Sequence, residues 1–222
     1  MWHKLWRRSK WLDAGATLAL ALRSVDNDFM TLLIGGLLLF IGAHLVPTQP
    51  ALRAALIRRV GEGPYKGAFS LISAIGIVLL VFGYGQMQGL ARGNPQLWVP
   101  PIWTKHLVFL LMVPAMILLV AAYVPSRIRS AVGHPLLTAL MLWAIGHLLA
   151  NGDLASVLLF GSFLAYAVCD RISVRHRAAP GPLGKTQGGT LGDAIAIGLG
   201  LVLYAFMLLW GHAKLIGVPL LP

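Results

Sequence analysis

Residues 135–169 read PLLTALMLWAIGHLLA-NGD-LASVLLFGSFLAYAVC, which is two apolar runs joined by three polar residues. Each run approaches the ~20 helical residues that a bilayer crossing needs. The linker Asn151-Gly152-Asp153 leaves room only for a tight turn between two helices. We therefore expect an antiparallel pair of membrane helices, and this hairpin predicts an all-α fold.

Further apolar segments extend the pattern in both directions along the chain. They run over about residues 30–46, 67–88, 103–124 and 191–212. The composition agrees, because 58% of the residues are hydrophobic and only 11% are charged, against roughly 25% charged residues in a soluble domain. The sequence therefore predicts a polytopic membrane bundle of about six transmembrane helices, with the lipid bilayer as its first partner.

The distribution of basic residues predicts how the chain crosses the membrane. The net charge of +11 raises the question of nucleic acid, but the basic residues fall in short clusters between apolar spans, so we expect no nucleic-acid partner. The loops after the first, third and fifth spans hold Arg53, Arg58, Arg59, Lys66, Arg127, Arg129, Arg171, Arg175, Arg177 and Lys185. The opposite side holds only Arg92, Lys105 and Lys214. We expect the first set of loops to be cytoplasmic.

Residues 1–29 conflict with this charge rule. They add several basic residues to the side predicted to be external, and their apolar run over residues 14–22 is too short to span. Two interpretations stay open: an interfacial leader anchored by tryptophans, or a non-native start upstream of Met30. In both, residues 30–222 form the membrane domain.

The histidines are the candidate functional residues. Five of the seven lie within or at the ends of apolar segments: His44, His106, His134, His147 and His212. Polar side chains in a membrane are costly and mark functional sites, and a neutral imidazole is a good ligand for iron or copper.

His44 and His134 are the pair that best fits one shared site. His44 ends the first span and His134 precedes the fourth, so both lie on the side predicted to be cytoplasmic. Two histidines on different helices at one depth can supply both axial ligands of a haem iron. The alternatives are an interfacial His44 and a His134 that only caps a helix.

His147 belongs to a different depth of the membrane. It follows His134 by thirteen residues, which is about 20 Å along a helix. One ion cannot touch both side chains, so His147 is either a metal ligand in a second cluster or part of a hydrogen-bonded structure. We expect His106 and His212 to be interfacial.

The sequence has no Walker loop, dinucleotide-binding glycine motif or HExxH motif, so the catalytic residues are unknown.

Several stretches together resemble one known family. Gly42-Ala43-His44-Leu45-Val46-Pro47, Tyr65-Lys66-Gly67-Ala68-Phe69-Ser70 and Gly133-His134-Pro135 followed by Gly146-His147 are similar to motifs of the NnrU family, and the resemblance covers about residues 30–212. It implies a bacterial inner-membrane protein associated with nitric oxide and denitrification.

The NnrU family is in turn similar to 15-cis-zeta-carotene isomerase, a membrane enzyme that uses b-type haem. This resemblance implies a haem b ligated by His44 and His134, with His147 similar to a further histidine of that enzyme. The isomerase also has a cysteine three residues before its second histidine, where this chain has Ala131.

Three functions follow from the resemblance and stay open at this point. The first is a haem b protein of nitrogen-oxide metabolism, which would handle a small nitrogen-oxide or lipophilic substrate. The second is a haem-dependent cis–trans isomerase of a carotenoid-like lipid. The third is a membrane accessory protein without catalysis.

Overall fold

The computed structural model describes residues 28–89, 93–177, 181, 183, 186 and 188–221. Within these ranges every regular element is helical, and β pairing is limited to two isolated bridges. The predicted all-α fold is thereby confirmed. The predicted leader covers residues 1–29, and its first 27 residues lie outside the described part of the chain.

The helices match the predicted spans closely. The first helix covers residues 28–45 and ends in the short 3₁₀ turn η1 (Val46–Thr48). The others are α2 (Pro50–Val60), α3 (Glu62–Gly89), α4 (Thr104–Ala121), α5 (Arg127–Val132), α6 (Pro135–Ala150), α7 (Leu154–Ser173), α8 (Thr190–Phe206), the π-helical turn η2 (Met207–Gly211) and α9 (His212–Leu215).

Most of these helices can cross a membrane. Five stretches of the described chain are long and apolar enough: residues 28–48, α3, α4, α7 and residues 190–215. α6 is a shorter apolar helix. The prediction of about six membrane helices is therefore confirmed, with α6 as the short one, and the chain is a multi-pass membrane protein.

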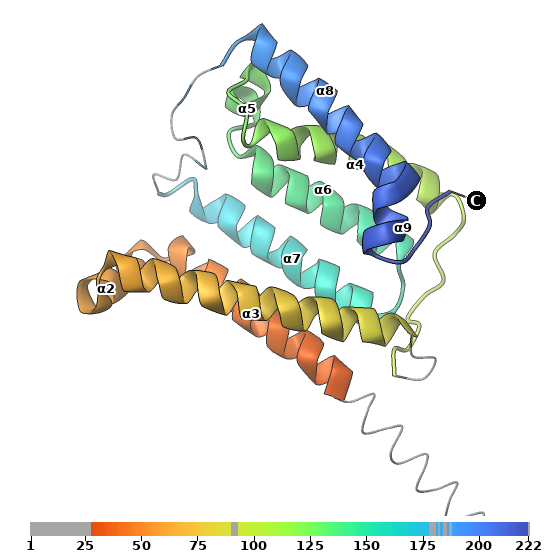
Figure 1. Ribbon diagram of the computed structural model, residues 1–222, viewed down its shortest axis with the longest axis horizontal. Helices are drawn as coiled ribbons and strands as arrows, with labels where there is room; N and C mark the ends of the chain where they lie inside the picture. The colour runs from red at the N-terminus through yellow and green to blue at the C-terminus, as the bar shows by residue number, and fades with distance from the viewer. Residues whose placement is uncertain are drawn as a thin grey trace, which may run out of the picture.

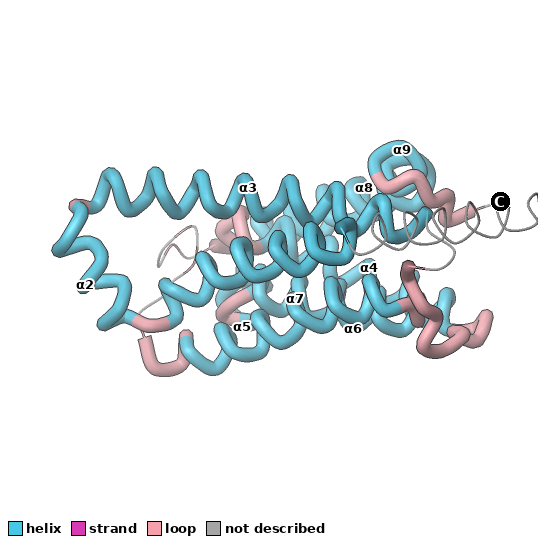
Figure 2. The backbone as a smooth tube through the Cα atoms, turned by 90° about the horizontal axis from the view of Figure 1, so that it is seen from below, coloured by secondary structure: helices cyan, strands magenta, loops and turns pink. Residues whose placement is uncertain are grey.

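The helices lie side by side, and α7 occupies a middle position. Figure 1 shows α7 between α6 and the pair formed by the first helix and α3, with α4 and α8 beyond α6. α4 packs against both α6 and α8, and α6 packs against α7. Figure 2 shows α2 turning from the end of the first helix to the start of α3.

A seam of small residues joins the first helix to α3. A Cβ built on Gly76 would lie 2.8 Å from the Phe40 nitrogen, and one on Gly83 would lie 2.5 Å from the Leu33 nitrogen. These positions therefore require glycine, since real Cβ atoms need more than 3.0 Å. Close backbone approach at small residues is how membrane helices gain packing energy without a hydrophobic driving force.

The predicted hairpin of α6 and α7 is present, and Asp153 caps it. The Asp153 carboxylate accepts hydrogen bonds from the Ser156 nitrogen (2.9 Å) and hydroxyl (2.6 Å), and from the side chains of Gln88 (3.1 Å) and Asn94 (2.7 Å). An N-cap aspartate satisfies backbone N–H groups that have no partner in the helix. Here it also ties α7 to the end of α3.

The structure differs from the sequence prediction between the spans. α3 begins at Glu62 rather than near residue 67, because Gly61 makes the turn at φ +86° and Glu62 pairs with Lys66 at 2.8 Å in the first turn. α2 and α5 occupy loops for which no helix was predicted.

The loops rich in lysine and arginine meet at one end of the bundle, which we call the basic end. The Ser173 hydroxyl donates to the Thr48 carbonyl at 2.9 Å, which joins the loops after the first helix and α7. Ser126 forms an isolated bridge with Gly189, beside α5. Figure 1 shows α2, α5 and the end of α7 on this side. The shared end agrees with the predicted sidedness of the basic loops.

Candidate functional site

His44 lies in the last turn of the first helix, half-buried among aromatic side chains. Its Nδ1 is 2.7 Å from the Phe40 carbonyl, and its ring stacks on the Phe40 ring with centroids 4.2 Å apart. Phe69 of α3 and Tyr166 of α7 complete the surroundings, with centroids at 5.0 and 6.0 Å. A carbonyl at Nδ1 fixes the tautomer with the proton on Nδ1 and leaves Nε2 available as a ligand.

His134 lies at the same end of the bundle, as the N-cap residue of α6. Gly133 before it ends α5 at φ +75°, a conformation that favours glycine, and Pro135 begins the next helix. The His134 side chain makes no capping hydrogen bond. Burial lowers its pKa below the usual value, and the nearby Arg171 guanidinium acts in the same direction. The His134 ring is therefore neutral at neutral pH and able to bind a metal.

Tyr166 is the side chain that the two histidines share as a neighbour. It meets the His44 ring edge-to-face, and it lines a cavity together with His134. The structure thus brings both predicted residues to the basic end, around one aromatic residue of α7.

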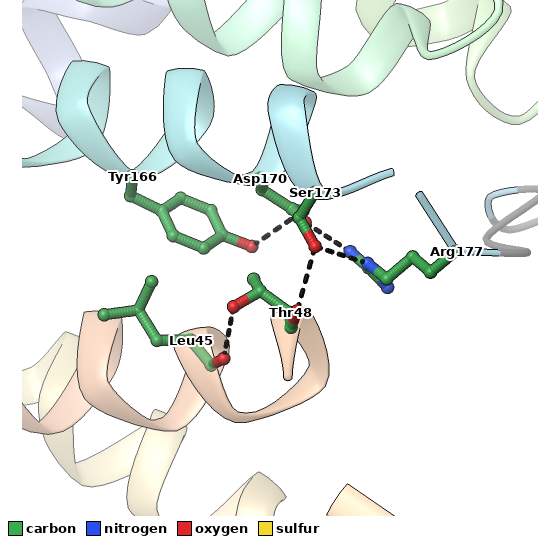
Figure 3. Close-up of polar contacts among 6 residues, drawn as sticks. All are labelled: Leu45, Thr48, Tyr166, Asp170, Ser173 and Arg177. Carbon is green, nitrogen blue, oxygen red and sulfur yellow. Dashed lines mark hydrogen bonds and ion pairs between the residues drawn. The ribbon is translucent and has the colours of Figure 1, made fainter. Parts of the chain in front are cut away.

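A polar network continues from Tyr166 towards the end of α7. Figure 3 shows Tyr166, Asp170, Ser173 and Arg177 in contact, and Thr48 joined to Ser173. The Tyr166 hydroxyl donates to Asp170 at 3.4 Å. Arg177 forms an ion pair with Asp170 and donates to the Ser173 hydroxyl at 3.1 Å. The network fixes the wall of the cavity beside His134.

The cavity has a volume of about 230 Å³. Its polar lining consists of Arg129, His134, Tyr166, Asp170 and Arg177, and the start of α6 forms one apolar wall. Small-molecule pockets usually measure roughly 300–1,000 Å³. The cavity is therefore too small for a whole haem unless Tyr166 or a neighbouring side chain moves.

His147 lies in the other half of α6, in an aromatic cluster. Its Nδ1 is 2.8 Å from the Trp143 carbonyl, its ring stacks on Phe160 with centroids 4.6 Å apart, and the Trp143 ring lies at 5.0 Å. Among the described residues, no three His, Cys, Asp or Glu side chains group in a way that could hold a metal. The structure thus gives His147 a packing role without adding ligands around it.

The other two candidate histidines lie at the opposite end of the bundle from His134. His106 is exposed at the start of α4. His212 begins α9, with Nδ1 2.7 Å from the Val218 carbonyl. These positions at helix ends fit the interfacial placement expected from the sequence.

His44 and His134 are the residues that would hold the haem implied by the family resemblance. His44 has its Nδ1 occupied by a carbonyl, His134 is neutral, and the two come from separate helices at one end. This chemistry fits a haem iron, which the two imidazole rings would hold. Arg177 and Arg129 nearby are the kind of side chain that binds carboxylates.

Sequence reasoning missed Tyr166, Asp170 and Arg177. A signal was present, because these polar side chains recur near the end of an otherwise apolar helix, and Tyr166 and Asp170 are four residues apart on one helix face. Their convergence on His134 depends on the tertiary packing of α6 against α7 and could not be read from spacing.

Comparison with known protein families gives a match over most of the chain. Residues 32–220 match the family described as NnrU protein. No curated protein and no solved structure matches the chain. Because the match covers most of the chain, this multi-pass membrane protein belongs to the NnrU family.

Proposed function

We propose that this chain is a haem b protein of the bacterial inner membrane that takes part in nitrogen-oxide metabolism, with His44 and His134 as the iron ligands. The observation that carries the proposal is the position of two half-buried imidazoles from separate helices, which share Tyr166 as a neighbour at one end of the bundle. The association with nitrogen oxides rests on the family resemblance alone.

The chain's own residues have distinct parts in this proposal. The Phe40 carbonyl orients the His44 ring and keeps Nε2 free. Gly133 and Pro135 set the backbone that presents His134. When bound, a b-type haem would supply one-electron redox chemistry or the binding of a small ligand.

The optical spectrum of the purified full chain tests the ligand assignment. The protein should show the absorption bands of a six-coordinate haem, either as purified or after haem is added. His44→Ala and His134→Ala should each remove or strongly shift these bands. His106→Ala and His212→Ala are the matched controls, because these histidines lie at the opposite end, and they should leave the spectrum unchanged. A chain that takes up no haem, or bands unaffected by both ligand variants, would overturn the proposal.

The physiological half of the proposal needs a separate experiment. Cells that lack this chain should grow more slowly than wild-type cells when nitric oxide or nitrite is supplied, and equally well without it. Growth that is equal in both conditions would disprove the nitrogen-oxide link while leaving haem binding intact.

A further inference from the structure

We propose that α2 is an interfacial helix whose Arg58 and Arg59 side chains recruit anionic phospholipid headgroups from the leaflet at the basic end. The inference does not depend on haem. It rests on where α2 lies, on which of its side chains are exposed, and on the charge of this part of the chain.

The position of α2 places it at the depth of the lipid headgroups. It connects the end of the first helix to the start of α3, and Figure 2 shows it running across the end of the bundle rather than along it. α3 has 28 residues, which is about 42 Å of helix, whereas the hydrocarbon core of a bilayer measures ~30 Å. The ends of α3 therefore extend beyond the hydrocarbon, and α2 is attached at one of these ends.

The surface of α2 combines apolar and basic side chains. None of its residues is fully buried. Leu52 is 48% exposed and Val60 53%, and Arg58 and Arg59 are exposed as well. Arg59 follows Leu52 by seven residues, which is about two turns, so both lie on one face of the helix. Apolar side chains that contact acyl chains, with arginines that extend to the phosphates, are typical of an interfacial helix.

The charge of this segment is complementary to an anionic surface. Residues 50–66 contain one acid, Glu62, and four cations, Arg53, Arg58, Arg59 and Lys66. Glu62 pairs with Lys66 at 2.8 Å, and the Arg53 guanidinium lies 5.7 Å from the centre of the Tyr65 ring. Arg58 and Arg59 form no ion pair with any residue that the structure describes. These two arginines are therefore the ones available to a ligand outside the chain.

Other arginines at the basic end are neutralised within the fold. Arg127 pairs with Asp193 at 2.6 Å, and Arg177 pairs with Asp170. For Arg58 and Arg59, the negative charge at the same depth is the phosphate of an anionic lipid. One arginine near an anionic leaflet surface strengthens the attraction by about fivefold.

The lipid composition beside α2 can be measured with a fluorescent probe. Cys169 is first replaced by serine, and the probe is attached to Ala54→Cys, an exposed position of α2. The full chain is placed in phosphatidylcholine nanodiscs that contain a small fraction of nitroxide-labelled phosphatidylglycerol or, separately, of nitroxide-labelled phosphatidylcholine. Quenching should report about fivefold more labelled phosphatidylglycerol than labelled phosphatidylcholine beside α2. High salt should reduce this excess, which tests the electrostatic origin without any change to the arginines.

The double variant R58Q/R59Q tests the two arginines directly. Glutamine has nearly the helix propensity of arginine, and both positions are exposed, so the variant should fold, which thermal unfolding checks. Its quenching by labelled phosphatidylglycerol should fall to the level of labelled phosphatidylcholine. Arg175→Gln is the matched control, because Arg175 is also exposed but follows α7, and this variant should keep the excess beside α2.

Three results would overturn the inference. The first is equal quenching by the two labelled lipids in wild type, which would leave an acidic protein surface as the occupant of α2. The second is an excess that is unchanged in folded R58Q/R59Q. The third is an equal loss in Arg175→Gln, which would identify a diffuse field of the whole basic end instead of recognition by α2. None of these results bears on the haem spectrum, so the two proposals fail separately.

Discussion

Asp153 accepts more hydrogen bonds than an N-cap residue requires. Its substitution therefore tests how much these hydrogen bonds stabilise the fold. Burial alone would raise its pKa, but the hydrogen bonds from Ser156, Asn94 and Gln88 outweigh burial and lower it. A carboxyl group with a lowered pKa in the folded state stabilises the fold above its unfolded pKa, which is about 3.9. That contribution is lost as the pH falls through the lowered pKa.

We therefore predict that Asp153→Asn lowers the unfolding temperature at pH 7 and abolishes part of the acid dependence of stability. The loss in free energy should be about 1–3 kcal/mol, because an N-cap and buried hydrogen bonds to a charged group are removed. Thermal unfolding of both proteins from pH 7 down to pH 3 measures it. Curves that keep a constant separation at every pH would contradict the assigned role.

Tyr166 allows a prediction about access to the histidine pair. Its ring contacts His44 and lines the cavity with His134, and that cavity is too small for a haem. Tyr166→Ala should therefore speed haem uptake by the apoprotein, measured by the growth of the haem absorption band after mixing. Tyr166→Phe is the control, since it keeps the ring and loses only the hydroxyl, and its uptake rate should match that of wild type. Equal rates in all three proteins would show that Tyr166 does not limit entry.

At the scale of single helices, the glycine seam between the first helix and α3 is the most specific packing feature. Gly83→Ala would place a Cβ 2.5 Å from the Leu33 nitrogen, so the two helices must separate. We predict destabilisation of about 1–3 kcal/mol, the usual cost of overpacking.

Gly85→Ala gives the matched control for Gly83→Ala. Gly85 is on the same helix, and a Cβ there meets nothing within 4 Å. The change should be neutral or stabilising by up to about 1 kcal/mol, because alanine favours the helix over glycine. Unfolding of both variants in detergent compares them, and similar losses at the two positions would refute the seam as a packing constraint.

The helices also show what could be predicted from sequence. The spans follow from the length of apolar runs, and α6 and α7 are bounded by Pro135 and by the polar turn at residues 151–153, so their starts were predictable. α2 and α5 were not, because each is short and carries arginines. α5 is moreover stabilised by its neighbours, since Ser126 caps it and Asp193 of α8 binds Arg127. The same holds for the candidate site. His44 and His134 were predictable as polar residues at span ends, whereas their shared neighbour Tyr166 is set by how α7 packs.

At the scale of the whole molecule, the basic end predicts the orientation in the membrane. After Cys169, the one cysteine of the chain, is replaced by serine, single cysteines at Arg58 and Lys105 provide exposed probes at the two ends. A membrane-impermeant maleimide should label Lys105→Cys on intact cells, and Arg58→Cys only after the membrane is opened. Labelling of both on intact cells would contradict the arrangement.

The position of α7 between the two groups of helices has a consequence for how the protein is made. Ribosomes add roughly 5–20 residues per second, so residues 90–153 separate the completion of α3 from the start of α7 by roughly 3–13 s. During this interval the first helix and α3 are in the membrane without the helix that later covers them, and the contacts at Gly76 and Gly83 are what hold them together. Because Gly76 and Gly83 lie between the two earliest spans, a substitution at either position should weaken this helix pair already at this stage, before α7 is made.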